Sequence, residues 1–163
     1  MLRDLGVTLD SSLSFNQHVM NTCRSAFLEV RHIGLIRKYL TVDAAKTSAC
    51  SLVFSRLAYC NSIMSGSPKC LIQKLQWVQN TAAWITLMMP RTEHTMPLLR
   101  MLHWLPVPNR IGYKIDSLCH TALTTAYPKY LSELLNVYTP ARPLGSSLNQ
   151  NILNIATART RKH

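Results

Sequence analysis

Residues 15–39 read FNQHVMNTCRSAFLEVRHIGLIRKY, and this stretch decides the fold class. Apolar side chains recur in it every three or four residues, which places them along one face of an α-helix. They are Phe15, Val19, Cys23, Ala26, Phe27, Val30 and Ile33. Ser14 and Gln17 stand three residues apart at its start, which is the spacing of a capping box. The sequence therefore predicts a long helix over residues 15–39 with one buried face.

Helix signals continue downstream. Thr41 is the expected N-cap of a second helix over residues 42–64, with Ala45, Ala49, Leu52 and Val53 facing inward. A third helix is expected between Pro68 and Pro90, and shorter helices over residues 94–102, 109–126 and 128–135. The third helix carries the apolar stripe Leu71, Leu75, Val78, Ala82 and Ile85. The predicted fold is mainly α, a bundle of about five to six helices.

The two ends of the chain differ from this pattern. Leu5–Asp10 alternates apolar and polar residues and predicts one short strand, for which no partner strand is evident. We therefore expect the chain to be a piece of something larger. Residues 139–163 are rich in Pro, Ser, Asn and Arg and are expected to be an extended or disordered basic tail. Three regions follow: 1–13, 14–138 and 139–163.

Charge points to a polyanionic partner. The chain has 163 residues, with 18 Lys and Arg against 7 Asp and Glu, a net charge of +11 and a pI near 9.9. Nucleic acid is the simplest partner for this balance, and an acidic membrane surface is a weaker alternative. No apolar run approaches the roughly 18 residues of a membrane span, and no secretory signal begins the sequence. We expect an intracellular protein, nuclear or cytoplasmic.

The cysteines and histidines suggest no metal site. Neither Cys-x-x-Cys nor His-x-x-x-His spacing occurs, so zinc-finger ligands are absent. The five cysteines are Cys23, Cys50, Cys60, Cys70 and Cys119, expected to be buried free thiols. His18 and His32 are expected on polar helix faces. His103-Trp104 is best explained by a Trp that covers the core, and Cys119-His120 cannot form a nucleophile–base pair because adjacent helical residues diverge.

Five blocks of sequence suggest a family. They are LGVTLD at 5–10, SRLAYCNS at 55–62, LQWVQNTAA at 75–83, LHWLPV at 102–107 and YLSELL at 130–135. In this order and spacing they resemble the C-terminal part of the reverse transcriptase of vertebrate non-LTR retrotransposons, of the LINE, jockey-like type. The resemblance extends from Leu5 to about Lys162. Ala58 stands where the family usually has Asp, and Trp84 where it usually has Arg.

The resemblance implies a place within that polymerase. Residues 1–13 would be a remnant of the strand that ends the palm, and residues 14–138 the helical thumb and post-thumb region. The family's Asp-Asp catalytic box lies upstream of this part, and no two carboxylates here are adjacent. Because polymerase chemistry needs two metal ions held by clustered carboxylates, we expect no enzyme activity from this chain alone, no cofactor and no small-molecule substrate.

Basic side chains are the candidate site. A thumb holds nucleic-acid backbone through Lys and Arg without reading bases, and the partner would be RNA or an RNA–DNA hybrid. The candidates are Arg24, Arg31, Arg37 and Lys38 on the long helix, and Arg159, Arg161 and Lys162 in the tail. The alternative is a co-opted or decayed helical module that contacts only protein. Apolar surface exposed without the palm would then favour self-association.

Overall fold

A computed structural model of the chain describes residues 2–10 and 14–135, and for residues 2–4 the backbone alone. These residues are mainly helical, as predicted. The elements are β1 (Leu2–Asp4), β2 (Val7–Leu9), α1 (Asn16–Ile36), η1 (Arg37–Tyr39), α2 (Val42–Ser48), η2 (Ala49–Phe54), α3 (Ser55–Ala58), η3 (Asn61–Met64), α4 (Lys69–Leu87), α5 (Thr95–Met101), α6 (Val107–Thr125) and α7 (Lys129–Ser132). No described helix is long and apolar enough to cross a membrane.

The predicted strand has a partner within the chain. β2 pairs with β1 in an antiparallel hairpin, with Asp4 opposite Val7 and Leu2 opposite Leu9. Leu5 and Gly6 form the two-residue turn, both with positive φ, at 44° and 80°. Two such residues in a row are what a type I′ hairpin turn requires. The expectation of an unpaired strand over Leu5–Asp10 is therefore wrong, because residues 5–6 form the turn and residues 2–4 form the partner strand, β1.

Helix α1 matches the predicted helix except at its start. Phe15 precedes it in a left-handed conformation and supplies no side-chain cap, and Ser14 Oγ accepts only from the Asn16 N–H, at 3.4 Å. The expected capping box is absent because Ser14 bonds instead to Asp10: its N–H donates to Asp10 Oδ1 at 2.7 Å and its hydroxyl to Asp10 Oδ2. Five of the seven stripe residues are buried: Val19, Cys23, Ala26, Val30 and Ile33. His18 is also buried, contrary to its expected place on a polar face.

The second predicted helix is a single helical run that changes type. Thr41 caps it as expected, its Oγ1 accepting from the Ala44 N–H at 3.2 Å. The middle of the run, η2, is π-helical, and each π turn includes an extra residue. The inward face consequently shifts, so that Val53 and Phe54 are buried while Leu52 is 43% exposed, contrary to prediction. The run ends at Ala58 rather than residue 64 because Cys60 has a φ of 50°.

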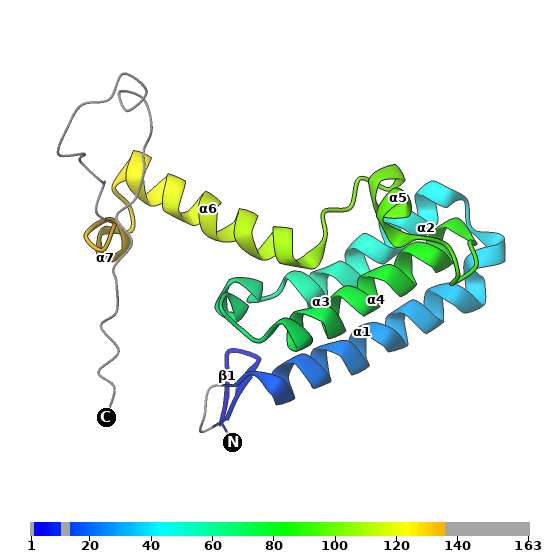
Figure 1. Cartoon of the computed structure of the whole chain (residues 1–163), viewed down its shortest axis with the longest axis horizontal. Helices are drawn as coiled ribbons and strands as arrows, with labels where there is room; N and C mark the ends of the chain where they lie inside the picture. The colour runs from blue at the N-terminus through cyan, green and yellow to red at the C-terminus, as the bar shows by residue number, and fades with distance from the viewer. Residues whose placement is uncertain (1, 11–13, 136–163) are drawn as a thin grey trace. The chain divides into compact units, whose positions relative to one another are not determined.

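Helix α4 forms the centre of the bundle. It lies alongside α1, and the α2–α3 run packs against both helices (Figure 1). Leu71, Leu75, Val78 and Ala82 are buried as predicted, and Ile85 is half-buried. The helix ends at Leu87, where the Met88 and Met89 N–H groups donate back to Ile85 O and Trp84 O, before Pro90.

Polar side chains of α4 fix the connector that follows α5. The fully buried Gln79 donates from Nε2 to Leu105 O at 2.9 Å, and Gln76 Oε1 accepts from the Val107 N–H at 2.8 Å. Trp104 directly precedes Leu105 and packs its ring edge-on against Phe54, with ring centroids 4.4 Å apart. Trp104 is 5% exposed, so the prediction that it covers the core is confirmed.

The chain divides into two compact units, residues 1–114 and 115–163, with the boundary inside α6. The first unit contains the hairpin and α1 to α5. In the second, α6 continues to Thr125 and α7 follows. The helical region expected over residues 14–138 includes residues of both units. The expected tail at 139–163 lies outside the described residues.

Candidate nucleic-acid interface

A groove runs between α1 and α4 within the first unit. It consists of three adjoining hollows of about 580, 400 and 340 Å³. Phe27 and Trp77 line both the first and the second hollow, while Leu35 and Ile85 line both the second and the third. We call this continuous feature the α1–α4 groove. Its floor is apolar, since Met20, Phe27, Leu35, Trp77 and Ile85 all face it.

Basic side chains border the α1–α4 groove. Arg24 and Arg31 of α1 and Lys38 of η1 follow one another at intervals of seven residues, which places them along one side of this helical run about 10 Å apart. Lys74 of α4 and Arg91, just beyond α4, line the groove as well. All five side chains are exposed. We call them the basic rim: Arg24, Arg31, Lys38, Lys74 and Arg91.

The charges of the basic rim are not neutralised by carboxylates. In the part of the chain that the structure describes, the ion pairs are His32–Glu29, Arg56–Glu29 and Lys129–Glu133. None includes a member of the basic rim. Glu29 is the single acidic residue of α1, and it bonds to Arg56 Nη2 at 2.7 Å. Positive charge is therefore concentrated along the groove and free to meet an external anion.

Arg37 has a different role from the one predicted. Its side chain is buried, with 7% exposed. Nε donates to Thr86 O at 2.8 Å and Nη1 donates to Leu40 O at 2.7 Å. The bond to Thr86 ties η1, which directly follows α1, to the last turn of α4, and the bond to Leu40 closes the turn after η1. Arg37 is thus a structural residue, and its guanidinium is occupied by backbone carbonyls rather than offered to phosphate.

The remaining predicted residues have separate outcomes. Lys38 is exposed beside the third hollow, with its ammonium 4.8 Å from the centre of the Tyr39 ring. Arg159, Arg161 and Lys162 lie outside the described residues. Of the candidates on the long helix, Arg24, Arg31 and Lys38 are exposed along one groove. Arg37 also lines the third hollow, but it is buried and its guanidinium is bonded to backbone carbonyls.

Trp77 is a groove residue that sequence reasoning missed. Its side chain is 52% exposed, although it stands in the middle of α4 beside the buried Val78. Its ring meets that of Trp84 edge-on, at 5.6 Å between centroids and 77° between planes. Trp84 is buried, and its Nε1 donates to Glu93 O at 3.1 Å. The signal available in the sequence was Lys74-x-x-Trp77, a cation and an aromatic on one face of α4, off the apolar stripe.

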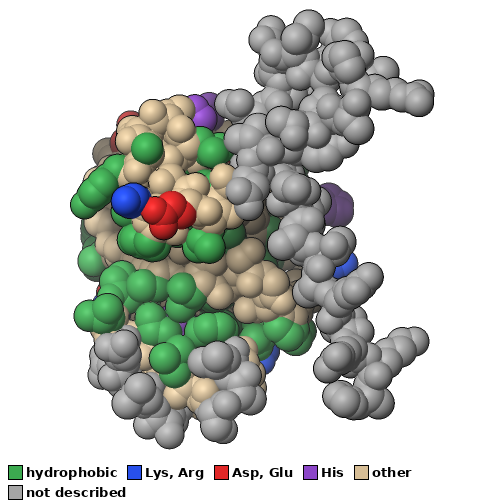
Figure 2. All heavy atoms as spheres, turned by 90° about the vertical axis from the view of Figure 1, so that its left-hand side faces the viewer, with side chains coloured by type: hydrophobic (Ala, Val, Ile, Leu, Met, Phe, Trp, Pro, Cys, Tyr) green, Lys and Arg blue, Asp and Glu red, His purple; other side chains and the backbone are tan. Residues whose placement is uncertain are grey.

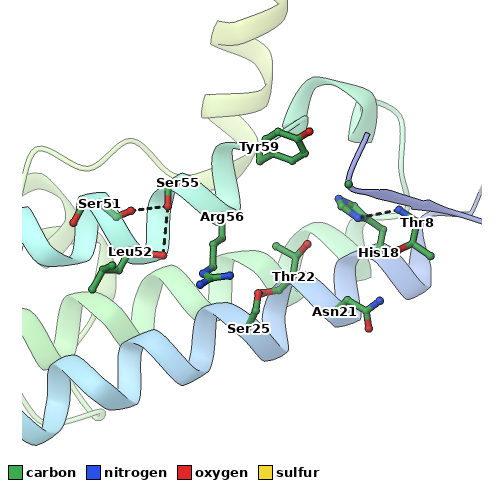
Figure 3. A pocket seen from close by; sticks show the side chains of 11 residues that line it. Thr8, His18, Asn21, Thr22, Ser25, Ser51, Leu52, Ser55, Arg56 and Tyr59 are labelled. Atoms are coloured by element: carbon green, nitrogen blue, oxygen red, sulfur yellow. Dashed lines mark hydrogen bonds between the residues drawn. The ribbon is translucent and has the colours of Figure 1, made fainter. Parts of the chain in front are cut away.

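A separate hollow of about 790 Å³, outside the α1–α4 groove, lies on another side of α1 (Figure 3). Side chains from β2, α1, η2 and α3 line it, and most carry hydroxyl, amide or ring nitrogen groups. Arg56 points into it from α3 (Figure 3), but Glu29 already neutralises this guanidinium. His18 accepts a hydrogen bond at Nδ1 from the Thr8 N–H at 3.5 Å, and burial lowers the pKa of its imidazole below 6.5. This hollow therefore offers an anion much less net positive charge than the α1–α4 groove.

Other features of the described residues limit the chemistry available. Cys50 and Cys70 are exposed, so the expectation that all the cysteines are buried is wrong. No group of three or more His, Cys, Asp and Glu that would hold a metal ion occurs in the described residues. The face of the molecule in Figure 2 shows few Lys and Arg side chains among its coloured atoms.

Comparison with known proteins yields no match, whether to family models, to curated proteins or to solved structures. The resemblance to LINE-type reverse transcriptases thus stands on the five sequence blocks alone. The structure distributes these blocks over the hairpin, the α3–η3 corner, α4, the α5–α6 connector and α7. The block in α4 contains both the buried Val78 and Gln79 and the exposed Trp77.

Proposed function

We propose that this chain is the thumb and post-thumb part of a LINE-type reverse transcriptase, of intracellular location, and that it binds the backbone of RNA or an RNA–DNA hybrid. The contact is made by the basic rim. One observation carries the proposal: five exposed Lys and Arg side chains border one groove, and none is paired with a carboxylate of the described residues.

The physical basis is the release of counterions. Each phosphate neutralised by a Lys or Arg frees condensed cations, so affinity falls steeply as salt is added. The net charge of +11 adds long-range attraction that accelerates encounter. Such contacts position a template and primer without reading sequence, which suits a thumb. We assign no catalytic step, cofactor or small-molecule substrate to this chain.

The test is binding of a fluorescently labelled RNA–DNA hybrid, followed by anisotropy across a salt series. The groove variant changes Arg24, Arg31 and Lys74 to Gln. The matched control changes Arg100, Lys114 and Lys129 to Gln, which removes the same charge from exposed residues that do not line the groove. The groove variant is expected to flatten the slope of log affinity against log salt by about 2, at roughly 0.7–0.9 per contact.

The control should change affinity modestly and leave most of the slope, since it affects only the general attraction. Equal effects of the two variants on the salt slope would show that affinity depends on net charge alone and that the groove is not the binding site. Absence of binding by a helical, monomeric wild-type chain would refute the proposal outright. Circular dichroism supplies the check on helicity for all three proteins.

The apolar floor of the groove favours a second candidate, a helical module that binds protein. Met20, Leu35, Trp77 and Met88 line it and are between 42% and 66% exposed. An apolar contact of this kind changes little with salt, in contrast to phosphate binding. Sedimentation velocity at two salt concentrations distinguishes the candidates: self-association that persists at high salt, without affinity for the hybrid, supports the module.

A further inference from the structure

We infer that the α1–α4 groove receives a single-stranded stretch of nucleic acid, with a base stacked on Trp77. The inference rests on the proposed function and specifies its ligand. Phosphate contacts alone would require only the basic rim. The groove also holds a half-exposed indole and an apolar floor, and phosphates do not use either feature.

Trp77 stands where a base would enter the groove. It lines the first and the second hollow, at the place where they join. The edge-on contact with the buried Trp84 restrains its ring, and Trp84 is in turn held by its bond to Glu93 O. An aromatic side chain that is ordered before binding loses little conformational entropy when a base stacks on it.

Cations lie on both sides of this indole. Arg24 and Lys74 line the first hollow beside it, and Arg31 and Arg91 line the second. Lys74 Nζ lies 3.7 Å from Met20 Sδ of α1, so its ammonium reaches across the groove. A basic groove that follows the backbone, with aromatic side chains on which bases stack, is the common arrangement of proteins that bind single strands.

The apolar floor favours a single strand over a duplex. A duplex presents phosphate and sugar to its surroundings. Burying phosphates against Met20, Phe27 and Leu35 would remove their bound water, and these apolar side chains offer no hydrogen bonds in its place. An unpaired base presents an apolar face to the same floor. From Met20 to Ile36, α1 rises about 24 Å, and η1 continues to Lys38, a length that accommodates several nucleotides.

Intrinsic fluorescence tests the stacking directly. Trp84 and Trp104 are each 5% exposed, so quenching by a bound base reports on Trp77. Titration with an oligothymidylate of about twelve nucleotides should quench the emission, and this strand should bind more tightly than an RNA–DNA hybrid of equal length. Trp77→Leu should abolish the quenching and weaken the single strand about fivefold or more, with a smaller loss for Trp77→Phe.

A cysteine footprint gives a second readout on the unaltered chain. Cys70 is exposed and lines the first hollow, whereas Cys50 is exposed and lies outside the groove. Bound oligothymidylate should slow maleimide labelling of Cys70 several-fold and leave Cys50 unchanged. Because this measurement needs no variant, it stands even if Trp77→Leu fails to fold.

The possible results separate the inference from the proposed function. If the hybrid binds with a steep salt dependence while the oligothymidylate binds no better, quenches nothing and leaves Cys70 unprotected, the inference is overturned and the proposed function stands. If neither nucleic acid binds, both are overturned. Equal protection of Cys50 and Cys70 also contradicts the inference, because the strand would then have no preference for the groove.

Discussion

Arg37 shows that a basic residue beside a groove can belong to the core. Sequence reasoning grouped it with Arg24 and Arg31, but its guanidinium donates to Thr86 O and Leu40 O. Arg37→Met keeps most of the side-chain volume and leaves both carbonyls without this donor. We expect the free energy of unfolding to fall by roughly 2 kcal/mol, the cost of lost bonds to a charged donor. Urea denaturation measures it.

The control for this prediction is Arg24→Met, at an exposed position on the preceding helix, α1. It should change the free energy of unfolding by less than about 0.5 kcal/mol and yet weaken nucleic-acid binding. Arg37→Met should therefore lower mainly the stability of the chain, and Arg24→Met mainly its affinity for nucleic acid. If the Arg37→Met chain keeps its stability but loses affinity for the hybrid, Arg37 contacts nucleic acid after all.

His18 gives the fold a dependence on pH. Burial lowers the pKa of its imidazole in the folded chain below the 6.5 of an unfolded one. Between those two values the unfolded chain binds more protons, so stability rises with pH through this window and is lost as pH falls through it. We expect the free energy of unfolding to decrease from about pH 7 to pH 5.

His18→Gln should flatten that part of the profile. Gln retains a polar side chain that can accept a hydrogen bond, as Nδ1 does from the Thr8 N–H. The matched control is His94→Gln, because His94 is exposed. An unchanged slope in the His18 variant, measured by urea denaturation at several pH values, would show that other groups cause the dependence.

At the scale of elements, sequence pattern predicted helices well and the joints between them poorly. The stripes of α1 and α4 were identified because a buried face repeats over many residues, and so was the cap at Thr41. The hairpin turn was missed because its first position is Leu5, a residue that rarely has positive φ. The π-helical η2 was missed because hydrophobic periodicity assumes one helical pitch throughout.

The sequence predicted only those residues of the candidate site whose exposure follows from the helical pattern. Arg24 and Arg31 belong to a helix whose buried face is clear, so their exposure followed from their position opposite it. Lys74 and Arg91 join them only because α4 packs beside α1, a tertiary relation that no local pattern contains. Whether Arg37 faces solvent or carbonyls depends on where α4 ends, and this too is set by packing.

For the molecule as a whole, unneutralised charge should limit stability. The chain carries 18 basic and 7 acidic residues, and the described part shows three ion pairs between side chains. Repulsion among like charges favours expansion, and salt screens it over about 10 Å at 0.1 M. We therefore expect the free energy of unfolding to increase as sodium chloride is raised from low concentration to about 0.2 M.

The groove variant connects this effect to function. Replacing Arg24, Arg31 and Lys74 by Gln removes repulsion between neighbouring cations, so the variant should be more stable than the wild type at low salt and gain less from added salt. The control at Arg100, Lys114 and Lys129 should gain less stability, because Lys129 gives up its pair with Glu133. Urea denaturation at two salt concentrations decides the matter. If the free energy of unfolding falls with salt in all three proteins, attractive ion pairs dominate and the basic rim does not destabilise the fold. If the free energy of unfolding rises most in the wild type, the clustered cations of the basic rim destabilise the fold, as expected of a binding surface.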